Sequence, residues 1–137
     1  MDFWNDSLFV GGDDVTFYYE NVYIEDTSTI CGPYEKKGPL RKYFDKTYND
    51  LYCGKESFEK GEIQLVRDAL VLILKKVGVK KEEVDLVIGG DLLNQIAAST
   101  YGCLGVGKSF IGVYGACSIC VLGFIIASNF IESWICF

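Results

Sequence analysis

The turn Gly115-Ala116-Cys117-Ser118 gives Cys117 the sequence context of a nucleophile. It follows an apolar run at 109–114 and precedes a second apolar run at 119–131. A short turn between a buried strand and a buried helix places its side chains at the helix N-terminus, where unpaired N–H groups and the helix dipole stabilise negative charge. A thiol in that position is a better nucleophile. The alternative is a small cysteine that only fills the strand–helix junction.

The absence of histidine restricts the chemistry of Cys117, because no Cys–His pair can form within this chain. Cys120 follows in a Cys-x-x-Cys spacing. Two cysteines alone are a weak signal for a zinc site, which would need a second cysteine pair or a histidine. The same spacing at a helix start also suits a redox pair. The apolar residues Val121–Phe124 predict that Cys120 is buried, which argues against both uses.

Composition and charge predict one acidic domain with free thiols. At 137 residues the chain has the length of a single domain, which we expect to span 1–137. Its net charge is −6 and no segment carries a basic stripe, so nucleic acid is not an expected partner. The acidic start lacks the form of a signal peptide, and the six cysteines lie mainly within apolar segments, so we expect a reduced, intracellular chain.

The hydrophobic patterning predicts strands that alternate with helices. Aromatic and β-branched runs favour strands, helical periodicity favours helices, and a long polar connection with both prolines is typical of a functional loop. In chain order we expect a peripheral segment at 1–14, a strand at Val15–Ile24, a loop at Glu25–Asp50, a helix from Ser57 to Gly78, a strand at Val84–Ile88, a helix from Asp91 to about Leu104, a strand at Ser109–Tyr114 and a helix at Ile119–Ile131. This βαβαβα order predicts an α/β fold with a mainly parallel sheet.

The uncharged run Ser109–Ile131 has a second interpretation as a transmembrane helix, because it is long enough to cross a bilayer. Glycines and the polar residues Ser118, Ser128 and Asn129 interrupt it, and no strong Lys/Arg flank adjoins it. A strand joined to a buried helix explains the same composition. Both interpretations therefore stay open, and the first alternative function is an integral membrane protein that spans at 109–131.

Three ordered segments carry a family resemblance. They are Gly38–Tyr48 (GPLRKYFDKTY), Gly90–Gln95 (GDLLNQ) and Tyr114–Ser118 (YGACS). In this order and spacing, over roughly Asn21–Ile131, the chain resembles the stage V sporulation protein AD family of endospore-forming bacteria. The resemblance implies a thiolase-like fold, in which two related halves pack as an αβαβα sandwich, and this chain resembles the N-terminal half alone.

The resemblance implies a non-enzymatic binding function. The family serves the spore-membrane complex that moves dipicolinic acid with its calcium, and it acts in sporulation and germination. We therefore expect a dipicolinic acid binding subunit, peripheral to the cytoplasmic face of the forespore or spore inner membrane, beside membrane-embedded partner subunits. The resemblance implies no cofactor, and calcium only as part of the ligand.

The resemblance also implies the ligand-binding residues: Cys117 and Ser118 in the turn, Asp91, Asn94 and Gln95 after the second strand, and Asp45 and Lys46 in the polar motif before the first long helix, a motif that Tyr48 also matches. A dicarboxylate there would accept helix N–H groups, Lys46 would add a charge-assisted contact, and Asp91 would meet calcium.

Each of these positions also has a purely structural interpretation. Asp91 is a favoured helix N-cap, and Asn94 with Gln95 suits a solvated first turn. Asp45 and Lys46 suit an exposed polar turn.

Two further expectations concern catalysis and assembly. The enzymatic alternative is a thiolase-superfamily acyltransferase with Cys117 as nucleophile, which would need a base and an oxyanion hole from elsewhere. A half-sandwich leaves an apolar face of its last helix uncovered, so we expect the chain to form a homodimer.

Overall fold

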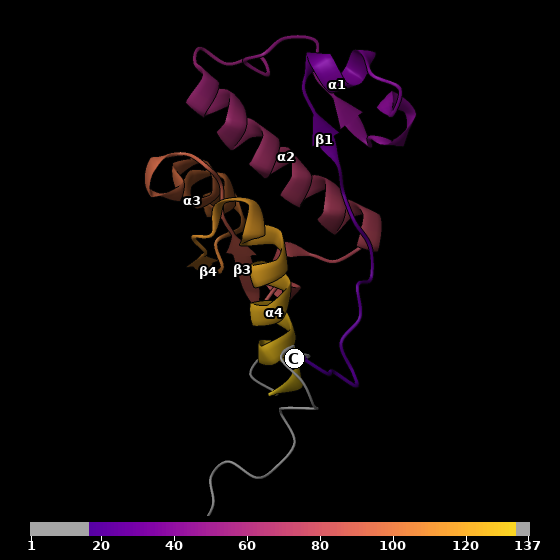
Figure 1. The fold of residues 1–137 in the computed structure, drawn as a ribbon, viewed down its shortest axis with the longest axis vertical. Helices are drawn as coiled ribbons and strands as arrows, with labels where there is room; N and C mark the ends of the chain where they lie inside the picture. Colours follow the sequence, from indigo (N-terminus) through magenta and orange to yellow (C-terminus); the bar gives the residue numbers. More distant parts are fainter. Residues whose placement is uncertain (1–16, 134–137) are drawn as a thin grey trace, which may run out of the picture.

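One long helix lies between two small parallel sheets. The structure is a computed structural model that describes residues 17–133; the segment at 1–14 and the apolar end at 134–137 lie outside the described residues. Helix α2 (Phe58–Val77) separates the pair β1 (Ile30–Cys31) and β2 (Lys46–Thr47) from the pair β3 (Leu86–Gly89) and β4 (Ser109–Gly112), as Figure 1 shows. Helix α1 (Pro33–Lys37) accompanies the first pair, and helices α3 (Ala97–Cys103) and α4 (Ile119–Glu132) accompany the second.

Helix α2 begins and ends where the sequence predicts. The Ser57 hydroxyl accepts a hydrogen bond from the Lys60 N–H at 3.3 Å, and Gly78 ends the helix in the left-handed conformation with a φ of 72°. Glycine adopts that conformation without the steric penalty of a Cβ. Lys75 and Lys76 in the last turn complement the negative end of the helix dipole.

The second sheet has the predicted parallel pairing. Strands β3 and β4 pair from Leu86 opposite Ser109 to Gly89 opposite Gly112, and α3 lies on the connection between them. Helix α4 follows β4 after a short turn, close to its predicted position. The structure is therefore a mixed α/β fold with short parallel sheets, consistent with a partial thiolase-like domain.

The strand predicted at Val15–Ile24 is wrong over its described part. Residues 17–24 form no strand, because among the described residues no other strand pairs with them. Hydrogen bonds from side chains of residues 17–29 hold this part of the chain against α4 and α2 instead. Tyr19 Oη donates to Asn129 Oδ1 of α4 at 3.2 Å, and Ser28 Oγ donates to the Ala69 carbonyl of α2 at 2.9 Å. Residues 17–29 are called the N-terminal strap below.

The predicted loop at Glu25–Asp50 contains regular elements that the patterning did not reveal. They are β1, α1, β2 and a 3-10 turn at Arg41–Tyr43. Pro33 lies in the first turn of α1, where its missing N–H removes no helical hydrogen bond. Pro33 therefore marks a helix start, and the interpretation of this proline as a loop signal was wrong.

Few side chains in the described residues are fully buried. The buried apolar residues are Cys31, Cys53, Ile96, Ala98, Cys103 and Val113. Every residue of β3 is half-buried, although its β-branched run predicted a strand covered on both faces. No residue of α4 is buried, although the helix carries no charge before Glu132. Much apolar surface of α4 therefore remains exposed.

The uncharged run Ser109–Ile131 does not form one helix. It divides into β4, a turn and the 14-residue α4, with Gly112 ending the strand and Gly115 opening the turn. Within residues 17–133, no helix has both the length and the apolar character needed to cross a membrane. Of the two interpretations of this run, the strand joined to a helix is confirmed and the single helix over 109–131 is not formed, because strand pairing with β3 takes up the first part of the run. The patterning of the run also predicted a buried Cys120, and this is wrong, because the thiol is exposed.

Candidate functional site

The carboxyl ends of β3 and β4 meet at one edge of the second sheet. Gly90 follows β3 and approaches the chain beyond β4 so closely that an added Cβ would lie 2.3 Å from the Val113 carbonyl oxygen. The Val113 N–H donates to the Gly89 carbonyl at 2.9 Å, which extends the pairing to this point. Open α/β sheets bind ligands outside such strand ends. We call residues 90–95 and 114–118 the elbow edge.

The cysteine turn is the strand–turn–helix elbow that the sequence predicts. Ala116–Ser118 forms a 3-10 turn between β4 and α4, and Cys117 is exposed within it. Ala116 has a φ of 46°, an uncommon left-handed conformation for a residue with a Cβ. The Ser118 N–H and hydroxyl both donate to the Gly115 carbonyl, at 2.8 and 2.7 Å, and these two bonds close the turn.

Asp91 stabilises the start of α3. Its Oδ1 accepts the Leu93 N–H at 2.8 Å, and its Oδ2 accepts the Ser99 N–H at 2.6 Å. Ser99 lies in the first turn of α3, so the carboxylate satisfies one of the unpaired N–H groups of that helix. The expectation that Asp91 is the N-cap of a helix beginning at Leu92 was therefore wrong, because α3 begins at Ala97 with Ile96 as its N-cap; Asp91 instead accepts an N–H of the first turn from eight residues away.

The helix predicted from Asp91 begins only at Ala97, because Gln95 and Ile96 adopt left-handed conformations with φ of 57° and 48°. A β-branched residue in that conformation is strained and persists only where its surroundings hold it. The Ile96 side chain is buried against β4, where a Cβ on Gly112 would lie 2.1 Å from Ile96 Cδ1. Asn94 and Gln95 are exposed. Each of the two segments of the elbow edge therefore contains a left-handed residue, Gln95 in one and Ala116 in the other.

Glu62 of α2 is a neighbour of this edge that the sequence analysis missed. Burial raises the pKa of the Glu62 carboxyl group, and the negative charge of Asp91 raises it further. Helical spacing could have indicated this position, because Glu62 lies one turn before Val66 on the same face of α2. In the structure Val66 packs against Gly102 of α3. The face of α2 that meets α3 therefore brings a second carboxyl group towards the loop after β3.

Asp45 and Lys46 belong to the other side of α2. The β1–β2 pair lies opposite β3 and β4 across this helix (Figure 1), and Asp45 and Lys46 lie with β2. Asp45 Oδ2 accepts the Thr29 N–H at 2.8 Å and the Thr29 hydroxyl at 3.0 Å, and Lys76 Nζ lies 3.2 Å from Oδ1. The bonds from Thr29 hold the pKa of Asp45 below its usual value.

Lys46 is bound to α2 through Asp68. Its Nζ lies 2.5 Å from Asp68 Oδ2, the Tyr48 hydroxyl donates to the same oxygen, and Gln64 Nε2 donates to Oδ1 at 2.9 Å. Burial acts to raise the pKa of Asp68, but the hydrogen bonds from Lys46 and Tyr48 outweigh it and the pKa lies below its usual value. The same bond raises the pKa of Lys46. The structure thus keeps Asp45 and Lys46 in contacts that fasten β2 and the strap to α2.

Replacing Asp68 with alanine should lower the free energy of unfolding by about 1–3 kcal/mol, because Lys46 and Tyr48 lose their shared acceptor. Urea denaturation followed by circular dichroism measures the difference. The folded pKa of Asp68 is depressed, so its contribution is complete above the unfolded value and is lost as pH falls through the folded one. The stability gap between wild type and Asp68→Ala should therefore shrink below about pH 4. A gap that stays constant down to about pH 2 contradicts this assignment.

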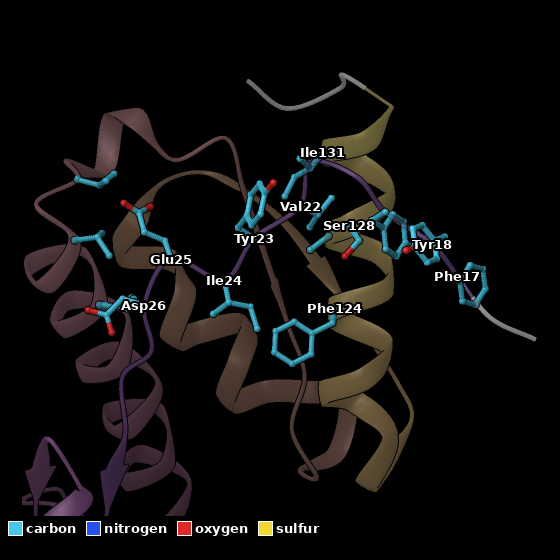
Figure 2. A pocket seen from close by; sticks show the side chains of 15 residues that line it. Phe17, Tyr18, Val22, Tyr23, Ile24, Glu25, Asp26, Phe124, Ser128 and Ile131 are labelled. Carbon is cyan, nitrogen blue, oxygen red and sulfur yellow. The ribbon is translucent and has the colours of Figure 1, made fainter.

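A groove of about 810 Å³ lies between the N-terminal strap and α4. Figure 2 shows its apolar lining, with Tyr23 and Ile24 from the strap and Phe124 from α4, and with Glu25 and Asp26 beside them. None of the predicted site residues lines it. Its lining carries two carboxylates and no cation, and Lys76 beside the groove already pairs with Asp26 at 3.4 Å, so the lining offers no cation to a dicarboxylate ligand.

Within residues 17–133, no group of three or more histidine, cysteine, aspartate or glutamate side chains comes together to hold a metal ion.

Comparisons with known proteins agree with one another. The family model of stage V sporulation protein AD matches residues 12–136. The protein of that name from Bacillus subtilis (strain 168) is 36% identical over 118 residues, which are 85% of this chain and 35% of that protein. The chain thus spans about a third of the length of this relative. The matched range includes the elbow edge and the motif around Asp45 and Lys46.

Proposed function

Because the chain belongs to the stage V sporulation protein AD family, which is involved in sporulation, we propose that it binds dipicolinic acid as the calcium complex and catalyses no reaction. The elbow edge supports this proposal. It presents the exposed Cys117 and Ser118 at the start of α4 and the exposed Asn94 and Gln95 on the neighbouring loop. These elements leave the ends of two paired strands, so one small ligand can contact both.

The charges near the elbow edge favour the calcium complex over the free dicarboxylate. Asp91 and Glu62 would repel a dianion. Calcium chelated by the ligand removes that repulsion and accepts hard carboxylate oxygens. The positive end of the α4 dipole favours the ligand carboxylates. In this proposal Asp45 and Lys46 act through the fold alone, because Lys76 and Asp68 already pair with their charges.

Isothermal titration calorimetry with calcium dipicolinate, dipicolinate alone and calcium chloride alone tests the proposal. The calcium complex should bind, and dipicolinate alone should bind about tenfold more weakly or worse, because the carboxylate repulsion returns. Circular dichroism establishes that the chain is folded during the titration. A folded chain that gives no binding heat with either form of dipicolinate would remove the ligand.

Replacing Asn94 with alanine should weaken binding of calcium dipicolinate about tenfold, the effect of one lost hydrogen bond to a charged ligand. Asn49→Ala is the matched control, because Asn49 is also exposed but bonds Lys36 in the segment that carries β1 and β2. It should bind as the wild type does. Equal weakening by the two variants would place the ligand elsewhere.

The exposed elbow also favours a second candidate, an acyltransferase of the thiolase superfamily with Cys117 as nucleophile. Incubation with an acyl-CoA thioester, followed by intact mass measurement and peptide mapping, decides between the two. Acylation confined to Cys117 supports the enzyme. An unmodified Cys117 after incubation, with calcium dipicolinate binding intact, supports the binding protein.

We further propose that the chain works on the cytoplasmic face of the forespore or spore inner membrane, as a peripheral partner of membrane-embedded subunits. This proposal rests on family membership. Alkaline carbonate treatment of spore membranes should release a peripheral subunit, and retention in the membrane fraction would contradict the proposal.

A further inference from the structure

We propose that the groove between the N-terminal strap and α4 docks a segment of a partner protein in which apolar side chains lie next to a lysine or arginine. This interaction surface goes beyond the proposed ligand binding at the elbow edge and does not depend on it. The groove has a volume of about 810 Å³, and apolar side chains along it stay exposed: Tyr23 is 80% exposed and Ile24 67%. Figure 2 shows these two side chains from the strap facing Phe124 of α4. Large apolar side chains that remain exposed around a concave surface are typical of an interaction site.

The backbone of the strap favours a polypeptide over a small molecule as the occupant. Within residues 17–133, no backbone–backbone hydrogen bond involves residues 17–28. Side-chain hydrogen bonds, such as that from Tyr19 to Asn129, anchor the strap instead. Aromatic and β-branched residues predominate at 17–24, and such residues favour a paired strand. A partner segment that lies along the strap can therefore pair with its free N–H and carbonyl groups, as an added β-strand does.

The charges beside the groove select a basic partner. Glu25 and Asp26 line it next to the apolar side chains (Figure 2). Lys76 lies 3.4 Å from Asp26 and 3.2 Å from Asp45, so two carboxylates already share this cation. Glu25 is exposed, and it forms no ion pair with any of the described residues. A lysine or arginine of the partner would complement Glu25.

The order of side chains along the strap defines the partner segment more closely. Tyr23 and Ile24 directly precede Glu25, so the basic residue of the partner must lie within about two residues of its apolar ones if the segment runs along the strap. The net charge of −6 favours the same basic partner, and it disfavours an anionic lipid surface as the occupant.

Selection of a random peptide library displayed on phage against the full chain tests the proposal. Enriched peptides should combine aromatic or aliphatic residues with a neighbouring lysine or arginine, and Glu25→Lys should not enrich them. Circular dichroism establishes that both proteins are folded. No enrichment, enrichment of peptides without lysine or arginine, or equal enrichment by the two proteins would each overturn the proposal. A groove filled by a second copy, or by another segment of the chain itself, would enrich no peptide.

Fluorescence anisotropy with a synthetic copy of one enriched peptide locates the binding. Ile24→Ser should weaken binding about tenfold, because an apolar contact is lost. Leu40→Ser is the matched control, since Leu40 is also exposed but does not line the groove, and it should bind as the wild type does. Equal weakening by the two variants would place the peptide elsewhere and overturn the proposal.

The same assay tests the charge. Glu25→Lys should weaken binding about tenfold and make it less sensitive to salt. Glu35→Lys adds the same charge at an exposed position of α1 that does not line the groove, and it should leave the affinity unchanged. A peptide that loses as much affinity with Glu35→Lys as with Glu25→Lys would contradict a basic contact at Glu25.

Two N-methylated versions of the peptide test strand pairing with the strap. One carries N-methyl groups on its odd-numbered residues and the other on its even-numbered residues. Alternate N–H groups of a strand point to opposite sides, so one version should lose the hydrogen bonds to the strap and bind about tenfold more weakly. Two versions that both bind as tightly as the unmodified peptide would overturn the pairing.

Discussion

Replacing Gly90 with alanine should lower the free energy of unfolding by about 3 kcal/mol or more, because backbone atoms leave no room for a methyl group at this position. The added Cβ would lie 2.3 Å from the Val113 carbonyl oxygen and 3.1 Å from two atoms of the Ile119 side chain. The carbonyl is backbone and cannot rotate away, because the Val113 N–H is bonded to the Gly89 carbonyl. The ends of β3 and β4 must therefore separate, and the elbow edge would open with them.

Urea denaturation followed by circular dichroism measures this loss. Gly105→Ala is the matched control, because a Cβ on Gly105 would meet nothing within 4 Å. That variant should change stability by less than about 1 kcal/mol, and in the stabilising direction if the helical propensity of alanine dominates. Equal stabilities for Gly90→Ala and Gly105→Ala would show that the close approach of the two strand ends is not a tight contact.

Replacing Val121 and Phe124 together with lysine should raise the dissociation constant for self-association about a hundredfold. These side chains are 61% and 52% exposed on α4, a helix with no charge before Glu132. The two residues are three positions apart on α4 and lie on one face of the helix, which we call the α4 seam, and Phe124 also borders the groove beneath the strap. In a solution of the purified chain, the partner available to this seam is α4 of a second copy, related by a two-fold axis.

Sedimentation velocity over a concentration series measures the association. The control is the double variant Val71→Lys with Leu40→Lys, which adds the same charge. These two side chains are 62% and 60% exposed and do not belong to α4. The control should dimerise as the wild type does. A wild-type chain that remains monomeric across the series, or a control that loses association equally, would contradict pairing through α4.

Local chemistry explains which elements were predictable. The two ends of α2, at Ser57 and Gly78, were predictable because a capping hydroxyl and a left-handed glycine each form hydrogen bonds with backbone groups a few residues away. The cysteine elbow was predictable for the same reason, since a β-branched run, a small-residue turn and an apolar run follow one another along the chain. The family motifs drew attention to five residues: Asp91, Asn94, Gln95, Cys117 and Ser118. In the structure these residues lie in the two segments that follow β3 and β4, at the same edge of the sheet.

Contacts between distant residues decided the rest. Residues 17–24 have strand-forming side chains, but no described strand pairs with them. They form part of the N-terminal strap, which hydrogen bonds to Asn129 and to the Ala69 carbonyl hold in place. Ile96 packs against Gly112 and holds the left-handed residues of the loop in place. For this reason α3 begins at Ala97 and not at Asp91, where the sequence predicted it. Asp45 and Lys46 are fastened to α2 by Lys76 and Asp68, partners far away in the sequence. Periodicity and capping signals report each residue's near neighbours along the chain, whereas strand partners, helix contacts and ion pairs exist only after the chain has folded back on itself.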